Sequence, residues 1–430
     1  ARTVDALGAW SARDAERWPE LLAATSDIAA VVALAMSRPA PPLDAPGAED
    51  LWHALQLGRR VRGLGRERLY QLLRWGPMAV ADFVAEWCET PVLQAAICAR
   101  GVLGAAAGPR SAGTTANWML QAALEGAPAG APTFTRGGPA SLAAALAVAA
   151  TGAGAEIRLD AEVMAIRVTD QGVAGVVLSS GDEISASLVV SGADPKRTLL
   201  DLVDPVRLPP SFRQRIARFR SSGMTAKVNL ALDELPVFPA LAALGLPAQE
   251  ALAGRVHIGA TVNDLERAFD CAKYGRMSDR PWLEVAFPSL ADPALAPPGR
   301  HVASIYVQWT PRDLREGDWH AARDRLGDLV VRTLAEHAPD LPAKIRAGEV
   351  LTPLDLETKF GLTGGHVFHG EHALDQLYSM RPAPGWAQYR MPVPGLYLCG
   401  AGTHPGGGLT GAPGRLAAQA VLKDLKRRNR

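Results

Sequence analysis

The sequence predicts a mixed fold that combines an α/β part with an α+β part. Three patterns support this prediction. Near the C-terminus, residues 396–398 are typical of a short buried strand, 400–414 of a glycine-rich loop and 416–426 of a helix. Residues 11–130 show the three- and four-residue spacing of apolar side chains that indicates helices. Residues 227–337 contain alternating segments typical of an antiparallel sheet, with a long amphipathic helix beside it.

The composition limits the classes of partner. With 430 residues the chain is long enough for two domains, and its net charge of +1 comes from interspersed acidic and basic residues. Such a charge distribution argues against nucleic acid as a partner. The four cysteines form no CxxC pair, which argues against a disulfide framework, a zinc site or dithiol chemistry and favours a reducing, cytoplasmic compartment. They are Cys88, Cys98, Cys271 and Cys399.

No transmembrane helix is predicted. The longest nearly uncharged run, residues 137–155, is mostly alanine and glycine and is too weakly hydrophobic for a membrane span. Peripheral membrane contact and a homo-oligomer both stay open, because the sequence decides neither.

The first 130 residues are predicted to be rich in helices, which the spacing places at residues 18–36, 51–73, 78–87 and 92–103. Four tryptophans recur in this block: Trp52, Trp75, Trp87 and Trp118. We interpret them as core or helix-contact residues; the alternative is that they line a substrate cavity.

The pattern changes after Arg136. Gly137 and Gly138 precede a predicted helix at residues 141–150. Short strands are then predicted at residues 156–159, 162–169, 173–179 and 184–190. This segment is either a small sheet without a ligand or part of a binding domain, and the residues alone favour neither.

The central part is predicted as a second α+β unit. Its strands are expected at residues 227–232, 255–261, 282–287 and 301–309, and its long helix at residues 319–337. An antiparallel sheet with one open face is a common platform for a substrate.

The glycine-rich loop has the composition of a site where backbone approaches a ligand. Glycine occupies seven of the fifteen positions from Gly400 to Gly414. A loop of this kind turns sharply and offers unpaired N–H groups, and the helix after it points the positive end of its dipole at negative charge. The pattern therefore indicates a backbone site for a phosphate or a flavin.

Three histidines before this loop invite a metal interpretation. His366, His369 and His372 follow each other at steps of three. Because glycines interrupt the segment and no carboxylate or thiolate set accompanies it, we predict no metal and expect histidines that contact a cofactor or stabilise a loop. Asp355 and Glu357 are expected to fix the loop and not to act as the paired carboxylates of a hydrolase.

Several motifs that lie apart in the sequence resemble those of a known family. The run from Gly400 to Leu409 resembles the C-terminal flavin signature of the phytoene desaturase-like FAD-dependent oxidoreductases, relatives of the amine oxidases. Further motifs are similar to the branch named pyridine nucleotide-disulfide oxidoreductase domain-containing protein 2. They lie at residues 351–357, 364–370, 374–376, 381–382 and 395–399.

The resemblance implies non-covalently bound FAD and assigns residues to it. Glu162 and Val163 would hold its adenine end through backbone contacts. Gly400, Ala401, Gly402 and Thr403 would approach the pyrophosphate and ribityl chain, and Gly408, Leu409, Thr410, Gly411 and Ala412 would lie against the flavin ring. Gly137 and Gly138 would let a helix approach the ring from the substrate side. Many amine-oxidase relatives have a carboxylate where this chain has Ala401, so backbone N–H groups or water would replace that contact.

The resemblance also implies a domain order. Residues 131–197 and 350–430 would form an incomplete Rossmann-like FAD-binding domain. Residues 1–130 would be the helical part, and 198–349 the antiparallel-sheet part, of a substrate domain. No G-x-G-x-x-G turn for the pyrophosphate is present, as though roughly a hundred residues of a βαβ unit were missing before residue 1. Such a unit would be trimmed from a longer chain, lost, or supplied by another polypeptide.

The implied activity is hydride transfer from a C–H or C–N bond of an apolar organic substrate to flavin N5. No catalytic residue is identified; His366, His369 and Arg381 are the polar candidates nearest the inferred ring. A nicotinamide partner is suggested only by the name of the branch. The rival hypothesis is a non-catalytic flavin-fold remnant that acts by binding another protein.

Overall fold

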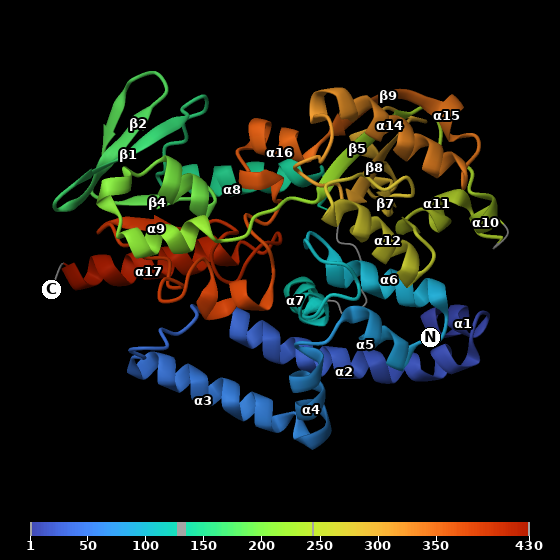
Figure 1. Ribbon diagram of the computed structural model, residues 1–430, viewed down its shortest axis with the longest axis horizontal. Helices are drawn as coiled ribbons and strands as arrows, with labels where there is room; N and C mark the ends of the chain where they lie inside the picture. The colour runs from blue at the N-terminus through green and yellow to red at the C-terminus, as the bar shows by residue number, and fades with distance from the viewer. Residues whose placement is uncertain (1, 127–134, 243–244, 429–430) are drawn as a thin grey trace. The chain divides into compact units, whose positions relative to one another are not determined.

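The computed structural model describes residues 2–126, 135–242 and 245–428, and its chain divides into two compact units. Unit 1 contains Ala1–Gly130, Ala161–Gly223 and Leu356–Arg430 (Figure 1), whereas unit 2 contains Ala131–Asp160 and Met224–Asp355. Residues 131–160 thus group with the sheet segment, and the helical block groups with the C-terminal segment. The roles proposed for the four predicted segments stay predictions.

The first part of unit 1 is helical, as predicted. Its helices are α1 (Arg2–Gly8), α2 (Ala12–Met36), α3 (Ala48–Gly63), α4 (Gly65–Trp75), α5 (Val80–Trp87), α6 (Pro91–Val102) and α7 (Thr114–Glu125). The helix predicted at residues 51–73 is divided into α3 and α4 because Gly65 takes a left-handed φ of +76°, which interrupts the helix. Ser11 caps α2 by accepting a hydrogen bond from the Asp14 N–H at 3.0 Å.

The tryptophans of this block divide into two groups. Trp75, Trp87 and Trp118 are buried, and the rings of Trp75 and Trp118 both pack against Phe83 at about 5 Å between centroids (4.8 and 4.9 Å). The core interpretation is therefore confirmed for these three, whereas Trp52 is exposed on α3.

Among the described helices, α2 alone has the length and hydropathy of a membrane span. A third (33%) of its most apolar window is buried in the fold. A core helix of a globular domain has the same properties, so no span is assigned to α2.

Two small sheets complete unit 1. β1 (Val163–Thr169), β2 (Gly172–Leu178) and β3 (Glu183–Ser185) form an antiparallel sheet, and β4 (Val189–Ser191) pairs in parallel with β10 (Leu396–Leu398). The strand predicted at residues 184–190 is thus two strands in different sheets. Two helices, α9 (Pro210–Ala217) and α17 (Ala412–Arg428), also belong to this unit, and α17 packs against β10 (Figure 1). The parallel pair lies next to the glycine-rich loop, as expected for the α/β part.

One predicted strand is wrong. Residues 156–159 form no strand; they are exposed, and no neighbouring strand pairs with them. Their short apolar alternation lacks the partner that a strand needs for its backbone hydrogen bonds.

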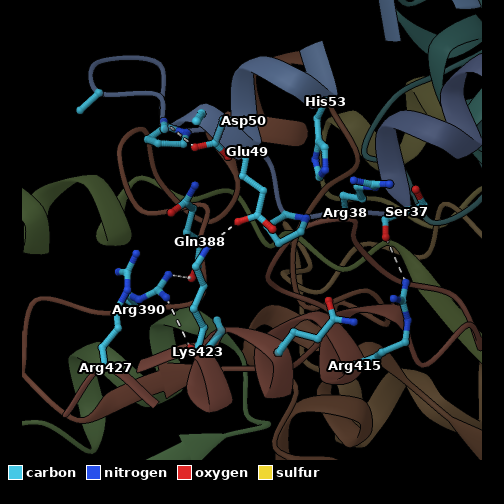
Figure 2. Close-up of a pocket in the computed structure, with 17 residues that line it drawn as sticks. Ser37, Arg38, Glu49, Asp50, His53, Gln388, Arg390, Arg415, Lys423 and Arg427 are labelled. Carbon is cyan, nitrogen blue, oxygen red and sulfur yellow. Dashed lines mark hydrogen bonds and ion pairs between the residues drawn. The ribbon is translucent and has the colours of Figure 1, made fainter. Parts of the chain in front are cut away.

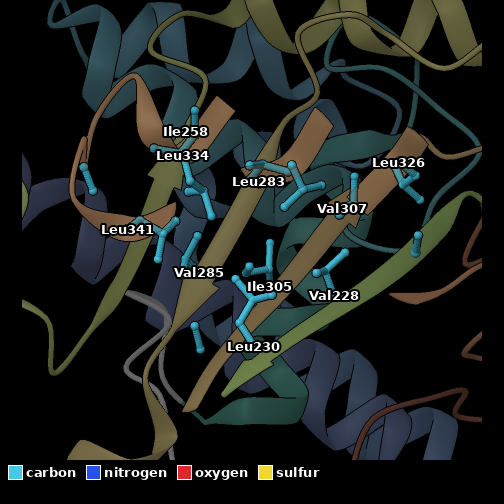
Figure 3. Close-up of a cluster of buried hydrophobic side chains, with 14 of the residues drawn as sticks. Val228, Leu230, Ile258, Leu283, Val285, Ile305, Val307, Leu326, Leu334 and Leu341 are labelled. Carbon is cyan, nitrogen blue, oxygen red and sulfur yellow. The ribbon is translucent and has the colours of Figure 1, made fainter. Parts of the chain in front are cut away.

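Unit 2 is built on a five-stranded antiparallel sheet in the order β6-β7-β8-β5-β9. The strands are β5 (Thr225–Leu232), β6 (Arg255–Ile258), β7 (Leu283–Ala286), β8 (His301–Gln308) and β9 (Ile345–Leu351). Alternate side chains, among them Val228, Ile305 and Val285, form a buried apolar cluster with Leu326 and Leu334 of α14 (Trp319–Ala335), as Figure 3 shows. Each such side chain contributes about 1.5–3 kcal/mol relative to exposure. The four predicted strands and the long helix are confirmed, and β9 was not predicted.

The other helices of unit 2 are α8 (Pro139–Gly152), α10 (Pro239–Ala242), α11 (Ala248–Ala251), α12 (Val262–Lys273), α13 (Pro288–Ala291) and α15 (Leu341–Lys344). The helix α16 (Pro353–Phe360) carries the chain from unit 2 back into unit 1. Thr261 opens α12 with a reciprocal capping box to Asp264.

Candidate functional site

The predicted strand, glycine loop and helix are present in unit 1. β10 is fully buried and ends at Leu398, and α17 begins at Ala412, four residues earlier than predicted. Gly414 therefore lies in the first turn of the helix. The loop between them, residues 399–411, is directed towards the N-terminal end of α17, where N–H groups lack intrahelical partners.

The first part of the loop needs glycine because it packs closely on the protein itself. A Cβ atom at Gly400 would lie 2.4 Å from the Gly192 carbonyl oxygen, and one at Gly402 would lie 2.2 Å from Cδ of Pro195. At Gly406 and Gly407, a Cβ would meet the rings of His372 and Phe368 at 2.7 and 2.2 Å. Glycine at these four positions is thus explained by packing alone.

The second part of the loop is open. A Cβ at Gly411 would meet no atom within 4 Å, and one at Gly408 would meet Leu124 and Thr410 at 3.8 Å. Both glycines have positive φ angles, +117° at Gly408 and +64° at Gly411, and Leu409 between them is 87% exposed. This backbone is presented to open space at the start of α17.

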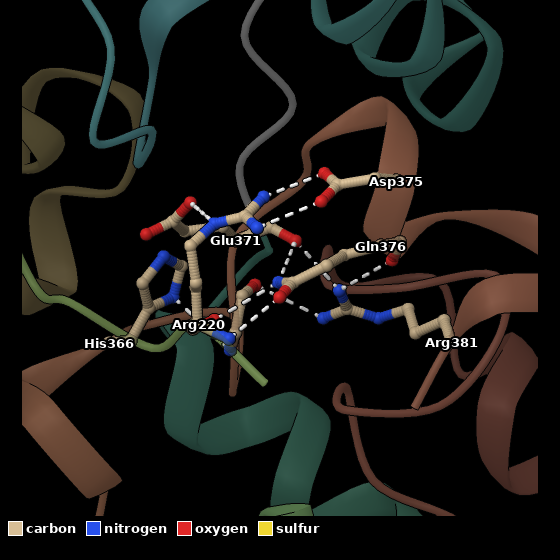
Figure 4. Close-up of polar contacts among 7 residues, drawn as sticks. Arg220, His366, Glu371, Asp375, Gln376 and Arg381 are labelled. Carbon is tan, nitrogen blue, oxygen red and sulfur yellow. Dashed lines mark hydrogen bonds and ion pairs between the residues drawn. The ribbon is translucent and has the colours of Figure 1, made fainter. Parts of the chain in front are cut away.

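A buried arginine holds the loop to the preceding segment. The guanidinium of Arg381 is fully buried and donates hydrogen bonds to the Ala401 carbonyl at 2.8 and 3.2 Å. It also donates to the carbonyls of Phe368, Gly370, Glu371 and Gln376 at 2.9–3.3 Å (Figure 4). Burial lowers the pKa of Arg381 to about 9. Because its donors are directed at carbonyls, Arg381 is better explained as a clamp than as the catalytic group that was considered.

Three buried histidines also support the loop. Nε2 of His372 accepts the Gly407 N–H at 3.0 Å, Nδ1 of His366 accepts the Phe368 N–H at 3.2 Å, and Nε2 of His404 lies 2.9 Å from the Arg38 carbonyl. Burial lowers the pKa of His366 to about 3 and that of His404 to about 4, and it lowers the pKa of His372 as well. These imidazoles are therefore neutral near pH 7. In the described part of the chain, no group of three or more histidine, cysteine or acidic side chains could hold a metal ion.

His369 differs from the other histidines. Its backbone has a positive φ of +57°, and its Nδ1 is buried without a hydrogen-bond partner among the described residues. That nitrogen would lie 3.2 Å from a Cβ at Gly400. Burial lowers the pKa of His369, and the nearby Asp194 carboxylate opposes this shift. His369 is thus a polar group placed directly beside the loop.

The segment after β4 is fixed by Asp194. Its buried carboxylate accepts hydrogen bonds from the Arg197 N–H at 3.0 Å and from the Thr363 hydroxyl at 2.7 Å. Gly192 and Pro195 on either side of Asp194 contact the glycine loop. Asp194 therefore fixes the backbone segment against which the loop packs.

The other predicted contacts lie elsewhere in the fold. Val163 begins β1 of unit 1, and the Glu162 carbonyl already accepts the Ser179 N–H at 2.8 Å. Gly137 and Gly138 precede α8 in unit 2, where the Gly137 N–H donates to Asp292. Contact of these four residues with a cofactor stays a prediction.

Unit 2 carries a polar row that sequence reasoning missed. Lys227, Tyr306, Glu284 and His257 occupy paired positions on β5, β8, β7 and β6, on the face opposite the apolar cluster. Glu284 lies 3.5 Å from His257 and from Arg255, and burial lowers the pKa of Lys227. The signal in the sequence was a lysine between apolar residues at the start of a predicted strand.

A buried strand, a glycine loop and a helix N-terminus define a protein that binds a nucleotide-type cofactor through its backbone. Comparison with known proteins specifies the class. The model of the family described as flavin containing amine oxidoreductase matches residues 91–422. The rat pyridine nucleotide-disulfide oxidoreductase domain-containing protein 2 is 38% identical over 381 residues, which cover 86% of this chain and 64% of that protein.

Two further similarities agree with this result. The 4,4'-diapolycopene oxygenase of a Methylomonas species is 30% identical over 302 residues, covering 68% of this chain and 55% of that enzyme. A solved structure of a putrescine oxidase variant superposes with a TM-score of 0.53 at 14% identity and covers 96% of this chain and 76% of that one. At that identity the structural likeness concerns the fold alone.

The chain belongs to the family of flavin-containing amine oxidoreductases, and its cofactor is FAD. It spans less than two thirds of the length of the rat relative, 64%. The open glycines fit this cofactor because they leave room for a planar ring at the positive end of the α17 dipole.

Proposed function

We propose that the complete protein is a FAD-dependent oxidoreductase that removes hydride from an apolar organic substrate. One observation carries the proposal. Gly408 and Gly411 face open space at the N-terminus of α17, whereas other protein atoms occupy the space beside Gly400, Gly402, Gly406 and Gly407. Gly408, Leu409, Thr410, Gly411 and Ala412 would hold the flavin ring, and Gly400, Ala401, Gly402 and Thr403 the ribityl and pyrophosphate part. When bound, FAD supplies an acceptor for hydride at N5.

The residues of this chain would orient the cofactor and stabilise the negative charge on its reduced ring. The positive end of the α17 dipole stabilises negative charge on the reduced ring, and the buried Arg381 guanidinium adds a fixed positive charge behind Ala401. His369, with its unpartnered Nδ1 beside Gly400, is the side chain of this loop region best placed to donate to a cofactor oxygen.

Desaturation of a C–C bond also needs a proton acceptor, because one hydrogen leaves as hydride and the other as a proton. We assign no residue to this step.

An amine is the second candidate substrate class. A cavity of about 330 Å³ in unit 1 is lined by His372, Glu371, Asp375 and Arg220. Two carboxylates face a single guanidinium there, with Arg220 donating to Glu371 at 3.0 Å and to Asp375 at 2.6 and 2.8 Å (Figure 4). The excess negative charge favours a cationic ligand, and the family description agrees with an amine.

The test is reduction of the bound flavin without oxygen. The full-length protein, loaded with FAD, is mixed with apolar hydrocarbons, alcohols and amines, and loss of oxidised-flavin absorbance is followed. We expect one apolar class to bleach the flavin. Bleaching by amines alone, lost in Glu371→Gln, would select the second candidate. A flavin that dithionite reduces but no organic class reduces would contradict both.

A further inference from the structure

A basic cavity of about 800 Å³ lies in unit 1, and neither of the open glycines, Gly408 and Gly411, lines it. It is bounded by the segment after α2, the start of α3 and one face of α17 (Figure 2). Arg415, Lys423 and Arg427 are separated by multiples of four residues and therefore project from the same face of α17. Arg38 and Arg390 line the cavity from other segments.

The cavity carries more positive than negative charge. Five arginine and lysine side chains line it, against two carboxylates, Glu49 and Asp50. Lys423 is paired with Glu49 at 2.5 Å, and Arg390 is paired with the neighbouring Asp424 at 2.6 Å.

The other three guanidinium groups of the cavity have no carboxylate within ion-pair distance among the described residues. Those of Arg38 and Arg427 act at longer range on Glu49 and Asp424, and each helps to lower the pKa of that carboxyl. The guanidinium of Arg415 donates a hydrogen bond to the Ser37 carbonyl at 3.1 Å (Figure 2). Like charges gathered around one cavity repel each other, and an anion that enters it relieves this repulsion.

Phosphate is the anion that such a group of arginines fits. Each guanidinium is planar and can donate two parallel hydrogen bonds to phosphate oxygens. The volume exceeds that of inorganic phosphate and suits a small organic molecule. Gln388 and Gln419 offer amide donors and acceptors. Burial together with Arg38 lowers the pKa of His53, so its neutral imidazole offers a surface on which a nucleobase can stack.

We propose that this cavity binds the phosphate groups of a nucleotide through Arg38, Arg415 and Arg427. The proposal goes beyond the function proposed above and does not depend on it. Because the FAD pyrophosphate is assigned to residues 400–403, which do not line this cavity, the nucleotide is a separate one. The Arg38 carbonyl lies 2.9 Å from Nε2 of His404, so an occupied cavity also steadies the base of the glycine loop.

The test is calorimetric titration of the full-length protein with ADP, NADPH and inorganic phosphate, each with and without bound FAD. We expect at least one nucleotide to bind more tightly than about 1 mM, and phosphate more weakly. The double variant Arg38→Gln with Arg427→Gln should weaken nucleotide binding about tenfold or more. Arg59→Gln, which removes an exposed arginine of α3 outside the cavity, is the matched control and should leave the affinity unchanged.

The FAD-loaded protein decides between a separate site and the cofactor site. Nucleotide binding to the FAD-loaded protein supports a separate site, whereas binding that FAD abolishes overturns the proposal. No saturable binding of any probe to either form overturns the proposal. Equal affinity in the double variant and the wild type also overturns it, provided that circular dichroism shows both to be folded.

Discussion

Lys227 is a charged group whose partly buried position costs stability. Burial lowers its pKa from the ordinary 10.5, so the unfolded chain binds the proton more tightly than the folded one. Stability at neutral pH is therefore reduced by this group and recovers as the pH rises from the lowered pKa towards 10.5. A residue kept at such a cost is a candidate for function.

We expect Lys227→Met to raise the melting temperature at about pH 7, because the variant no longer buries a charged amine. Lys344→Met is the matched control. Lys344 pairs with Asp340 at 2.8 Å and its pKa is raised, so its removal should lower the melting temperature. A Lys227→Met protein that melts below the wild type would contradict this account of the buried charge.

Arg381 represents the opposite case, a buried charge that the fold requires. Its removal leaves five buried carbonyls, including that of Ala401, without a donor. Arg381→Gln should lower the free energy of unfolding by about 3 kcal/mol or more and weaken FAD retention. Denaturant unfolding measures the first effect and flavin absorbance the second. If Arg381→Gln unfolds like the exposed-site variant Arg59→Gln, the clamp is unimportant.

The glycine loop is the element to which we assign the cofactor. Its closed part is fixed by packing on Gly192, Pro195 and Phe368, and its open part begins at Gly408. Glycines with these two different roles look the same in the sequence. Their spacing predicted the loop, but only the surrounding residues decide which glycine faces a ligand.

Gly411→Val tests the open part of the loop. Gly126→Val is its matched control, since Gly126 has a φ of +65° against +64° and also meets no atom within 4 Å. Both variants should lose about 1–2 kcal/mol to backbone strain, but only Gly411→Val should lose flavin. Gly402→Ala, whose Cβ would collide with Pro195, should be much less stable than either. Normal flavin content in Gly411→Val would refute the position given to the ring.

The strands show where the alternation of apolar residues is enough to predict secondary structure. Alternation predicted β5 and β8 because one face of each is buried against α14. It missed β9, whose central residues from Arg346 to Glu349 are exposed, and it placed a strand at residues 156–159, where no partner lies alongside. An edge strand is defined by its neighbour more than by its own residues.

At the scale of the whole molecule, the sequence predicted the mixed fold and the cofactor loop but not the grouping of segments. Residues 131–160 join unit 2 although the predicted boundary placed them with residues 161–197. The polar row from Lys227 to His257 also depends on strand order, since its members are contributed by four strands. Local patterns contain no information on which strands become neighbours.

The buried histidines predict how the folded protein responds to acid. The ordinary histidine pKa is 6.5, but His366 and His404 titrate at about 3 and about 4 in the folded state. As the pH falls below 6.5, the unfolded chain therefore takes up protons that the folded chain does not. Stability should fall by about 1.4 kcal/mol per pH unit for each of the two residues until the folded pKa is reached.

Urea unfolding between about pH 7 and about pH 4 measures this slope. His404→Gln should make the slope shallower, whereas His320→Gln, an exposed residue of α14, should not. A stability that does not change over this range would contradict the neutral, buried state of these imidazoles.

The central claim is that the loop between β10 and α17 holds the flavin ring of FAD. The most direct measurement is the ratio of flavin to protein, by absorbance, in the product of the natural full-length gene. We predict a ratio near one that falls close to zero in Gly411→Val and is retained in Gly126→Val. A full-length protein that purifies without flavin and takes up no added FAD would contradict the claim.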